Sequence, residues 1–350
     1  MARYIVAYAL GCALILASAG TPVANAASSP LPSAAASGAP TVVLNEYPIK
    51  TPNSGARYLT KGPDGALWFT QFDANQIGRI ATDGSVLEFP LRGDAHPSVI
   101  ITGPDGNVWF TETSPPAAIA MMTPKGTLKL FRLRTDYAGP VGIVAGPDGN
   151  LWFTEFTVDK IGRITPDGTI TEFALPPAPA PASSPGSSGT PPPPKGATEI
   201  TVGPDSNLWF TEQNANQIGR ITPSGAITEF PLVGDNNYPT SIVIGPDKNI
   251  WFTEVGTGKI GRMTVAGAVT SYAIPTRHSG PSSITVGPDN NIWFTETNVN
   301  QIAKISAKSG KITEVPLPSP DSGPFGITTG PDNALWFVES KSNKIARYTP

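Results

Sequence analysis

The chain has 350 residues, a formal net charge of −3 and a charged fraction of 15%. Its basic residues form no cluster, so a nucleic-acid partner is not expected. Cys12 is the only cysteine, which excludes an intramolecular disulfide and leaves the hydrophobic core to hold the fold together.

The first 40 residues have the features of targeting and linker sequence. Arg3 precedes an apolar run over residues 4–19, and Ala24-Asn25-Ala26 is a small-residue cleavage site, so residues 1–26 are predicted to be a signal peptide. A membrane anchor and lipidation at Cys12 are the alternatives, but the run is shorter than the roughly 20 residues of a spanning helix. Residues 27–40 are rich in Ala, Ser and Pro, which predicts a disordered lead-in. We expect a secreted or periplasmic protein, cleaved near Ala26, with no transmembrane segment in the mature chain.

A ten-residue motif, GPDGNLWFTE at Gly146–Glu155, organises the rest of the sequence. The motif begins again at Gly62, Gly103, Gly203, Gly245, Gly287 and Gly330, and each copy contains one of the seven tryptophans. The tryptophans are spaced by 41, 43, 57, 42, 42 and 43 residues, a period that is typical of propeller blades. Residues 41–350 are therefore predicted to form a single all-β domain, a seven-bladed β-propeller.

Each repeat contains four short strands separated by turns. In the third copy the Gly-Pro-Asp-Gly turn is followed by NLWFTE, by KIGRIT, by a second turn at Pro166-Asp167-Gly168 and by ITEF. Proline presets the backbone of such turns, and no stretch has the apolar spacing of a helix. Six outer strands follow the first motif, and a seventh, Glu46-Tyr47-Pro48, precedes it. We expect this N-terminal strand to close the ring in the last blade.

The spacing of 57 residues contains a Pro-rich insertion at Pro176–Lys195. It lies where the chain crosses from the third blade to the fourth. Its Pro, Ser and Gly content predicts an extended segment that packs against nothing. A solvated loop and a binding arm both fit this composition.

Two recurrent positions are expected on one face of the disc, which also carries the crossovers between blades. One is the acid that ends the second strand: Glu112, Glu155, Glu212, Glu254, Glu296 and Glu339, with Gln71 in the first blade. The other follows the crossover proline, beside the mouth of the central channel: Ser98, Val141, Thr240, Ser282 and Phe325. We call this side the acid-rich face.

The glutamates have a structural and a functional interpretation. Three of them are expected opposite lysines, in the pairs Glu155–Lys160, Glu254–Lys259 and Glu339–Lys344. Such cross-strand ion pairs contribute only about 0.2–1 kcal/mol each. The same register places most tryptophans opposite arginines, which predicts a repeated cation–π contact. A ring of acids around a channel mouth is also the strongest candidate for a cation site in the chain.

The repeat GPDGNLWFTE…KIGRITPDGTITEF resembles that of the virginiamycin B lyase (streptogramin lyase) family over residues 41–350. The resemblance implies a seven-bladed propeller that linearises streptogramin B antibiotics. It implies that the threonyl ester of the macrocycle opens by elimination, with Mg²⁺ as the cofactor. This chemistry needs a base for the threonine Cα proton and an electrophile for the developing enolate.

The functional residues of the family can be compared with the matching positions of this chain one by one. Its two histidines each follow a crossover proline, and they correspond to Ser282 and Phe325. The acid two residues before the second histidine corresponds to Gly323, so three positions have changed. Glu339 matches the family glutamate and is the metal ligand that the resemblance implies.

Three further residues are candidates on the acid-rich face. His96 and His278, the only histidines, are both predicted in crossovers. His278 lies four residues before Ser282 and is the candidate for a displaced base, whereas His96 and Glu296 are candidates for substrate binding.

Two classes of function fit these observations. The first is an exported, monomeric lyase-like enzyme that acts on a small cyclic ester or peptide-like ligand. The second is a non-catalytic propeller that binds a ligand, a surface glycan or a protein. A third alternative is a lactone-hydrolysing propeller with Ca²⁺ in the channel. A metal ion between channel-mouth glutamates would favour the enzymes, and a paired glutamate ring would favour binding.

Overall fold

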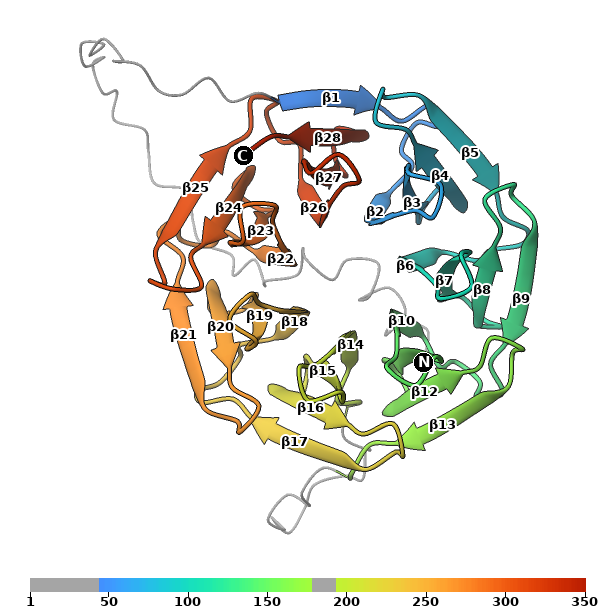
Figure 1. The fold of residues 1–350 in the computed structure, drawn as a ribbon, viewed down its shortest axis with the longest axis vertical. Coiled ribbons are helices and arrows are strands. Elements are labelled where there is room, and N and C mark those ends of the chain that lie inside the picture. The colour runs from blue at the N-terminus through green and yellow to red at the C-terminus, as the bar shows by residue number, and fades with distance from the viewer. Residues whose placement is uncertain (1–43, 178–192) are drawn as a thin grey trace, which may run out of the picture. The chain divides into compact units, whose positions relative to one another are not determined.

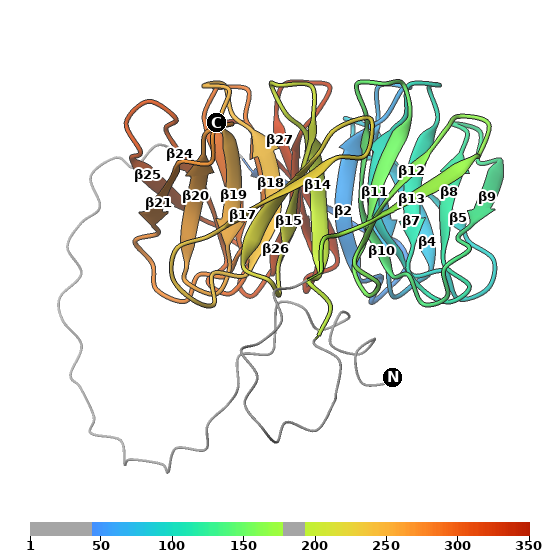
Figure 2. The same ribbon diagram turned by 90° about the horizontal axis from the view of Figure 1, so that it is seen from below.

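The computed structural model describes residues 44–177 and 193–350, and its regular elements in these ranges are all β-strands. Seven four-stranded antiparallel sheets surround a central axis as the blades of a propeller (Figure 1). From the side, the strands run between the two faces of a disc (Figure 2). The predicted fold and the number of blades are confirmed. The predicted signal peptide and lead-in lie outside the described residues, and within those residues no helix could cross a membrane.

The blades are numbered in chain order, with strands given from the channel outward. Blade 1 contains β2 (Ala56–Lys61), β3 (Leu67–Gln71), β4 (Gln76–Ile80) and β5 (Val86–Pro90). Blade 2 contains β6 (Pro97–Thr102), β7 (Val108–Glu112), β8 (Ala118–Met122) and β9 (Leu128–Arg132). Blade 3 contains β10 (Pro140–Ala145), β11 (Leu151–Glu155), β12 (Lys160–Ile164) and β13 (Ile170–Ala174). Blade 4 contains β14 (Ala197–Val202), β15 (Leu208–Glu212), β16 (Gln217–Ile221) and β17 (Ile227–Pro231).

The remaining blades follow the same order. Blade 5 contains β18 (Pro239–Ile244), β19 (Ile250–Glu254), β20 (Lys259–Met263) and β21 (Val269–Ala273). Blade 6 contains β22 (Pro281–Val286), β23 (Ile292–Glu296), β24 (Gln301–Ile305) and β25 (Ile312–Pro316). Blade 7 contains β26 (Pro324–Thr329), β27 (Leu335–Glu339), β28 (Lys344–Tyr348) and, as its outer strand, β1 (Leu44–Pro48).

The N-terminal strand closes the ring, as predicted. β1 pairs antiparallel with β28, with Leu44 opposite Tyr348 and Tyr47 opposite Ile345. In Figure 1 the blue β1 lies on the outer side of the red β28. The Tyr47 ring stacks on Trp336 with centroids 5.7 Å apart. Aromatic rings of the outer strand stack on the tryptophan in the same way in other blades. β1 therefore serves as the outer strand of blade 7.

The motif residues explain how neighbouring blades pack. All seven tryptophans are fully buried. Trp68 of blade 1 shares a core cluster with Val108 and Phe110 of blade 2. The tryptophan side of the motif in one blade therefore packs against the opposite side of the motif in the next blade. Burial of a large apolar side chain contributes about 1.5–3 kcal/mol. Because this interface recurs around the ring, the blades stabilise one another.

The turn aspartate of the motif fixes the tryptophan and the facing arginine. Trp152 Nε1 donates to Asp148 Oδ1 at 3.0 Å, and Arg163 lies over the Trp152 ring at 5.5 Å. The predicted cation–π contact is confirmed here and for Trp209 and Trp251. Gly146, the first residue of the motif, makes room for the indole, because a Cβ there would lie 2.4 Å from Trp152 Cδ1.

The insertion ends within packed structure. Lys195 is only 6% exposed, its Nζ lies 2.5 Å from Glu229 Oε1, and its N–H donates to Asp159 Oδ1 at 2.6 Å. The predicted boundary of the unpacked segment at Lys195 is therefore wrong. The central part, residues 178–192, lies outside the described residues.

Removal of residues 178–192 is expected to change the melting temperature by less than about 2 °C, because their composition buries little apolar surface. In contrast, Lys195→Ala should lower the free energy of unfolding by about 3 kcal/mol, because it leaves the carboxylate of Glu229 without its buried partner. Thermal unfolding followed by circular dichroism measures both effects. A larger loss from the deletion than from Lys195→Ala would contradict this account.

Candidate functional site

Every inner strand has a β-bulge directly after its first residue, which is the crossover proline in five blades and Ala56 or Ala197 in the other two. In β10 the register with β11 shifts between Pro140 and Ile143, which places Val141 and Gly142 outside the regular ladder. The same shift occurs in the inner strands of the other six blades. A bulge bends the strand and redirects a side chain. The sequence therefore builds a ring of bulges beside the channel mouth.

A threonine of the motif holds each bulge in place from blade 1 to blade 6. Thr154 Oγ1 accepts the Gly142 N–H at 2.9 Å and donates to the Thr198 carbonyl of the next blade at 2.6 Å. In blade 6, Thr295 donates to the Phe325 carbonyl at 2.7 Å. In blades 2 to 6 the threonines thus position the mouth residues of the following blade, whereas Thr70 of blade 1 bonds to Tyr58 of its own blade. Sequence reasoning missed this role, although a threonine in six of the seven motifs was the available signal.

Ser282 and Phe325 are both engaged in structural contacts. Ser282 is buried, and its Oγ lies 2.6 Å from Thr297 Oγ1 and 3.1 Å from the Gly280 carbonyl. The Phe325 ring meets Tyr58 edge-on, with centroids 5.4 Å apart. Neither side chain offers the proton-accepting nitrogen of an imidazole.

The two histidines lie in separate parts of the ring. His96 belongs to the crossover between β5 and β6, and His278 belongs to the crossover between β21 and β22. These two crossovers lie across the ring from each other (Figure 1). His96 Nδ1 lies 2.7 Å from Ser114 Oγ, and its ring packs on Phe72. His278 is exposed and has a left-handed backbone conformation, with φ of 58°. The structure does not bring the two imidazoles together.

The glutamates of the acid-rich face are buried, and among the described residues none of the three predicted pairs with a facing lysine forms an ion pair. Glu254 accepts from the hydroxyls of Thr257 and Ser271 instead of pairing with Lys259. Lys160 is opposite Glu155 in the ladder, yet its Nζ binds Glu172 Oε2 at 2.6 Å. Lys344 is opposite Glu339 and binds Glu46. The predicted register is confirmed for all three pairs, and the predicted ion pairs are wrong. Lys160 and Lys344 reach the acid of the outer strand instead, whereas the outer strand of blade 5 has Ser271 at that place.

Burial changes the protonation of these glutamates. Within the described part of the chain, neither carboxyl oxygen of Glu155 or of Glu296 has a hydrogen-bond partner. Desolvation, reinforced by the neighbouring outer-strand glutamate, raises the pKa of each to about 8. Desolvation also raises the pKa of Glu112 and of Glu212 to about 7. Glu155 and Glu296 are therefore mostly protonated, and so neutral, at pH 7.

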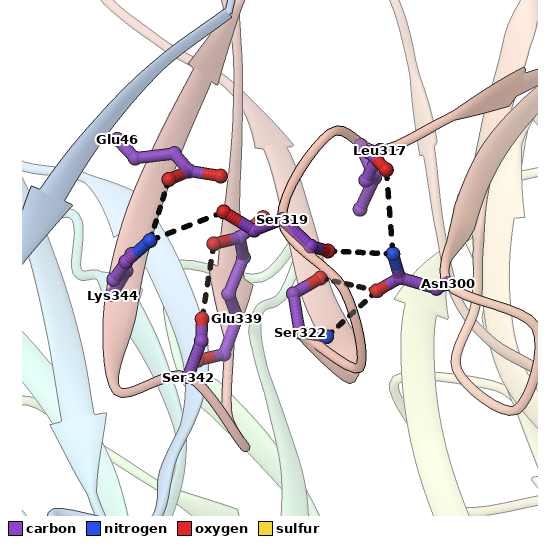
Figure 3. Close-up of polar contacts among 8 residues, drawn as sticks. All are labelled: Glu46, Asn300, Leu317, Ser319, Ser322, Glu339, Ser342 and Lys344. Atoms are coloured by element: carbon purple, nitrogen blue, oxygen red, sulfur yellow. Dashed lines mark hydrogen bonds and ion pairs between the residues drawn. The ribbon is translucent and has the colours of Figure 1, made fainter.

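Glu339 lies in a polar cluster at the end of blade 7 (Figure 3). Its Oε2 accepts from Ser342 Oγ at 3.1 Å, and its Oε1 is buried without a partner. Glu46, held by Lys344 Nζ at 2.6 Å, is close by. Burial, and then the charge of Glu46, raise the pKa of Glu339.

Asn300 fixes the crossover beside this cluster. Its Nδ2 donates to the Ser319 carbonyl at 2.7 Å, and its Oδ1 accepts from Ser322 Oγ at 2.6 Å (Figure 3). The crossover is thereby tied to the neighbouring blade, which fixes the approach to Glu339.

The donors around Glu339 do not fit Mg²⁺. This ion prefers octahedral oxygen ligands. Gly323 and Phe325, which stand at two of the carried-over positions, have no side-chain oxygen. One oxygen of Glu339 already accepts from Ser342. Among residues 44–177 and 193–350, no three His, Cys, Asp or Glu side chains are grouped so that they could hold a metal ion.

The sequence profile of the virginiamycin B lyase family matches residues 38–185 and 181–350. The chain belongs to this family. The crystal structure of selenomethionine-substituted virginiamycin B lyase from Staphylococcus aureus is 36% identical, with a TM-score of 0.79, and covers 88% of this chain and 99% of that one. A catalytically inactive histidine-to-alanine variant from the same organism, with quinupristin, has a TM-score of 0.80.

Curated relatives match over shorter stretches. Virginiamycin B lyase of Bordetella bronchiseptica is 42% identical over 60 residues, 17% of this chain and 20% of the relative. Virginiamycin B lyase of Nocardia farcinica is 30% identical over 118 residues, 34% of this chain and 41% of the relative. The chain thus aligns with less than half the length of these curated relatives.

Proposed function

We propose that this member of the virginiamycin B lyase family is a binding propeller. In this proposal it holds a small cyclic ester or peptide-like ligand on the acid-rich face, after export, and does not open the ring at a useful rate. The observation that carries the proposal is the pair Ser282 and Phe325, at the positions of the family histidines. A buried, hydrogen-bonded hydroxyl and a phenyl ring cannot remove a Cα proton.

The S. aureus relatives support a separation of binding from reaction. The histidine-to-alanine variant of that lyase is described as catalytically inactive, and its structure was determined with quinupristin. Loss of a histidine is therefore compatible with a bound ligand in that protein. By analogy, Phe325 stands at the position of a family histidine in this propeller. It adds apolar surface to the channel mouth and cannot act as a base.

Mg²⁺ has no assigned part in this proposal. The cofactor was predicted from the resemblance alone, and the donor set around Glu339 does not favour it. We therefore expect ligand affinity to be the same with and without Mg²⁺.

Slow ring opening is the second candidate function, and the exposure of His278 favours it. A displaced imidazole could take the Cα proton of the esterified threonine. The electron pair would then form the Cα–Cβ double bond, and the carboxylate would leave from Cβ. This route requires the crossover of His278 to move toward the channel mouth.

Titration calorimetry with quinupristin tests the proposed binding. We expect a dissociation constant in the micromolar range, roughly 1–100 µM. Phe325→Ala should weaken binding about tenfold, because it removes apolar surface from the mouth. Val265→Ser is the control, since Val265 lies in an exposed turn between β20 and β21 on the other face. Absence of binding, or equal affinity in Phe325→Ala and the intact protein, would contradict the proposal.

A further inference from the structure

The central channel contains a cavity of about 220 Å³ with one charged side chain in its lining. Aliphatic residues of six inner strands form much of its wall: Leu59, Ile100, Ile143, Ile200, Ile284 and Ile327. Glu199 is the charged residue, and Tyr58 is the aromatic one. β14, which carries Glu199, and β2, which carries Tyr58, stand across the channel from each other (Figure 1).

Glu199 stands at an unusual position in the repeat. It is the second bulge residue of blade 4, where blade 3 has Gly142 and blade 7 has Gly326. Blades 5 and 6 have serine at this position, and blades 1 and 2 have Tyr58 and Val99. Where the residue is glycine the inner strands approach closely; a Cβ on Gly326 would lie 2.3 Å from the Arg57 carbonyl oxygen. A carboxyl group at this position therefore projects into the channel, and the architecture of the ring does not require it.

The hydrogen bonds of Glu199 are incomplete. Its Oε2 accepts from Ser241 Oγ at 2.6 Å and from the Ile242 N–H at 3.4 Å. Its Oε1 is buried and has no hydrogen-bond donor among the described residues. Burial raises the pKa of this carboxyl, and the Ser241 and Tyr58 hydroxyls oppose the rise. A buried carboxylate oxygen without a donor is costly, so a ligand that donates to Oε1 gains free energy.

The surroundings favour a positively charged donor. None of the described residues that line the cavity is a lysine or an arginine. Tyr58 and Phe325 form an edge-to-face pair beside it, and aromatic faces attract cations. The guanidinium group of Arg57, the residue that precedes Tyr58, stacks on the Phe72 ring at 3.5 Å. A single carboxylate provides too few oxygen ligands for a divalent metal ion, whereas it suits an ammonium group.

We propose that the channel mouth binds the ammonium group of an organic amine. Glu199 supplies the carboxyl group, whose charged form the ammonium group stabilises, Tyr58 supplies the aromatic wall, and the aliphatic ring receives the alkyl part. This site does not depend on binding of a cyclic ester, so it goes beyond the proposed function.

The test is titration of the intact mature chain with n-butylammonium chloride, with n-butanol as the uncharged probe of similar size, followed by NMR chemical shifts. For a ligand of this size we expect a dissociation constant of about 1 mM. The amine should bind at least about tenfold more tightly than the alcohol, and Glu199→Gln should remove this difference. Asp83→Asn, which removes the same charge from an exposed turn, is the control and should bind the amine like the intact protein.

Two results would overturn the proposal. One is equal binding of n-butylammonium and n-butanol by the unmodified chain, a comparison that needs no variant to fold. The other is a folded Glu199→Gln variant that retains the full preference for the amine.

Discussion

A chain that begins at residue 49, and therefore lacks β1, is expected to melt at least about 10 °C below the intact protein. Without β1, β28 becomes an exposed edge and Trp336 loses the stacked ring of Tyr47. Lys344 also loses its ion pair with Glu46. Together these losses correspond to about 5 kcal/mol or more. Differential scanning calorimetry at fixed protein concentration measures the change.

A chain that begins at residue 44 is the matched control, because it retains the whole of β1. It is expected to melt within about 2 °C of the intact protein. Tyr47→Ala should have an intermediate effect, about 2–4 kcal/mol, since it removes only the ring that covers Trp336. If the chain that begins at residue 49 has the same melting temperature as the control that begins at residue 44, β1 does not hold the ring closed.

The variant Glu296→Gln is expected to stabilise the protein by about 1–3 kcal/mol at pH 8.5 and to have little effect near pH 4. Glu296 is fully buried without hydrogen bonds and faces the neighbouring charge of Glu314, and its pKa is raised to about 8. In the unfolded chain the same group ionises near its ordinary pKa of 4.5. Glutamine stays neutral in both states, and its amide can donate to Glu314.

The sign of the pH dependence follows from proton counts. Below about pH 4.5 both states hold the proton, so Glu296 contributes nothing. Between about pH 4.5 and 8 the unfolded state loses the proton and the folded state keeps it, so the free energy of unfolding falls as pH rises. Above about pH 8 the full destabilisation is present. Glu296→Gln should flatten this part of the stability curve.

Blade 1 provides the reciprocal control. Gln71 occupies the equivalent position, and its Nε2 donates to Glu88 Oε1 at 3.3 Å. Gln71→Glu should therefore lower stability at pH 8.5 by a similar amount, about 1–3 kcal/mol. Urea unfolding at a series of pH values measures both variants. Destabilisation by Glu296→Gln at pH 8.5 would show that this carboxyl is ionised and stabilising in the folded state.

The repeat made the backbone largely predictable. Seven copies of one motif fix the strand period, the turns and the faces, and Glu46-Tyr47-Pro48 ahead of the first copy identified the closing strand. The facing residues Glu155 and Lys160 were also predictable, because a four-residue loop sets the register. These features depend on local backbone geometry, which sequence patterns report directly.

The choice of side-chain partners was less predictable. Lys160 binds Glu172 rather than the facing Glu155, because a long side chain can reach two neighbouring strands and register alone does not distinguish them. Lys195 was assigned to the unpacked insertion by composition, although its partner Glu229 lies on the outer strand of blade 4. Glu199 was missed in the sequence. A carboxylate in the otherwise uncharged inner strand β14 was the available signal.

The most direct test of the account is incubation of the purified protein with quinupristin and Mg²⁺, followed by liquid chromatography and mass spectrometry. Virginiamycin B lyase from S. aureus is the positive control. Elimination gives a linear isomer of unchanged mass and altered retention, whereas hydrolysis adds one water. We expect the macrocycle to remain intact, because Ser282 and Phe325 supply no base. A linear isomer that forms with turnover and disappears in His278→Ala would contradict the account and establish the second candidate function.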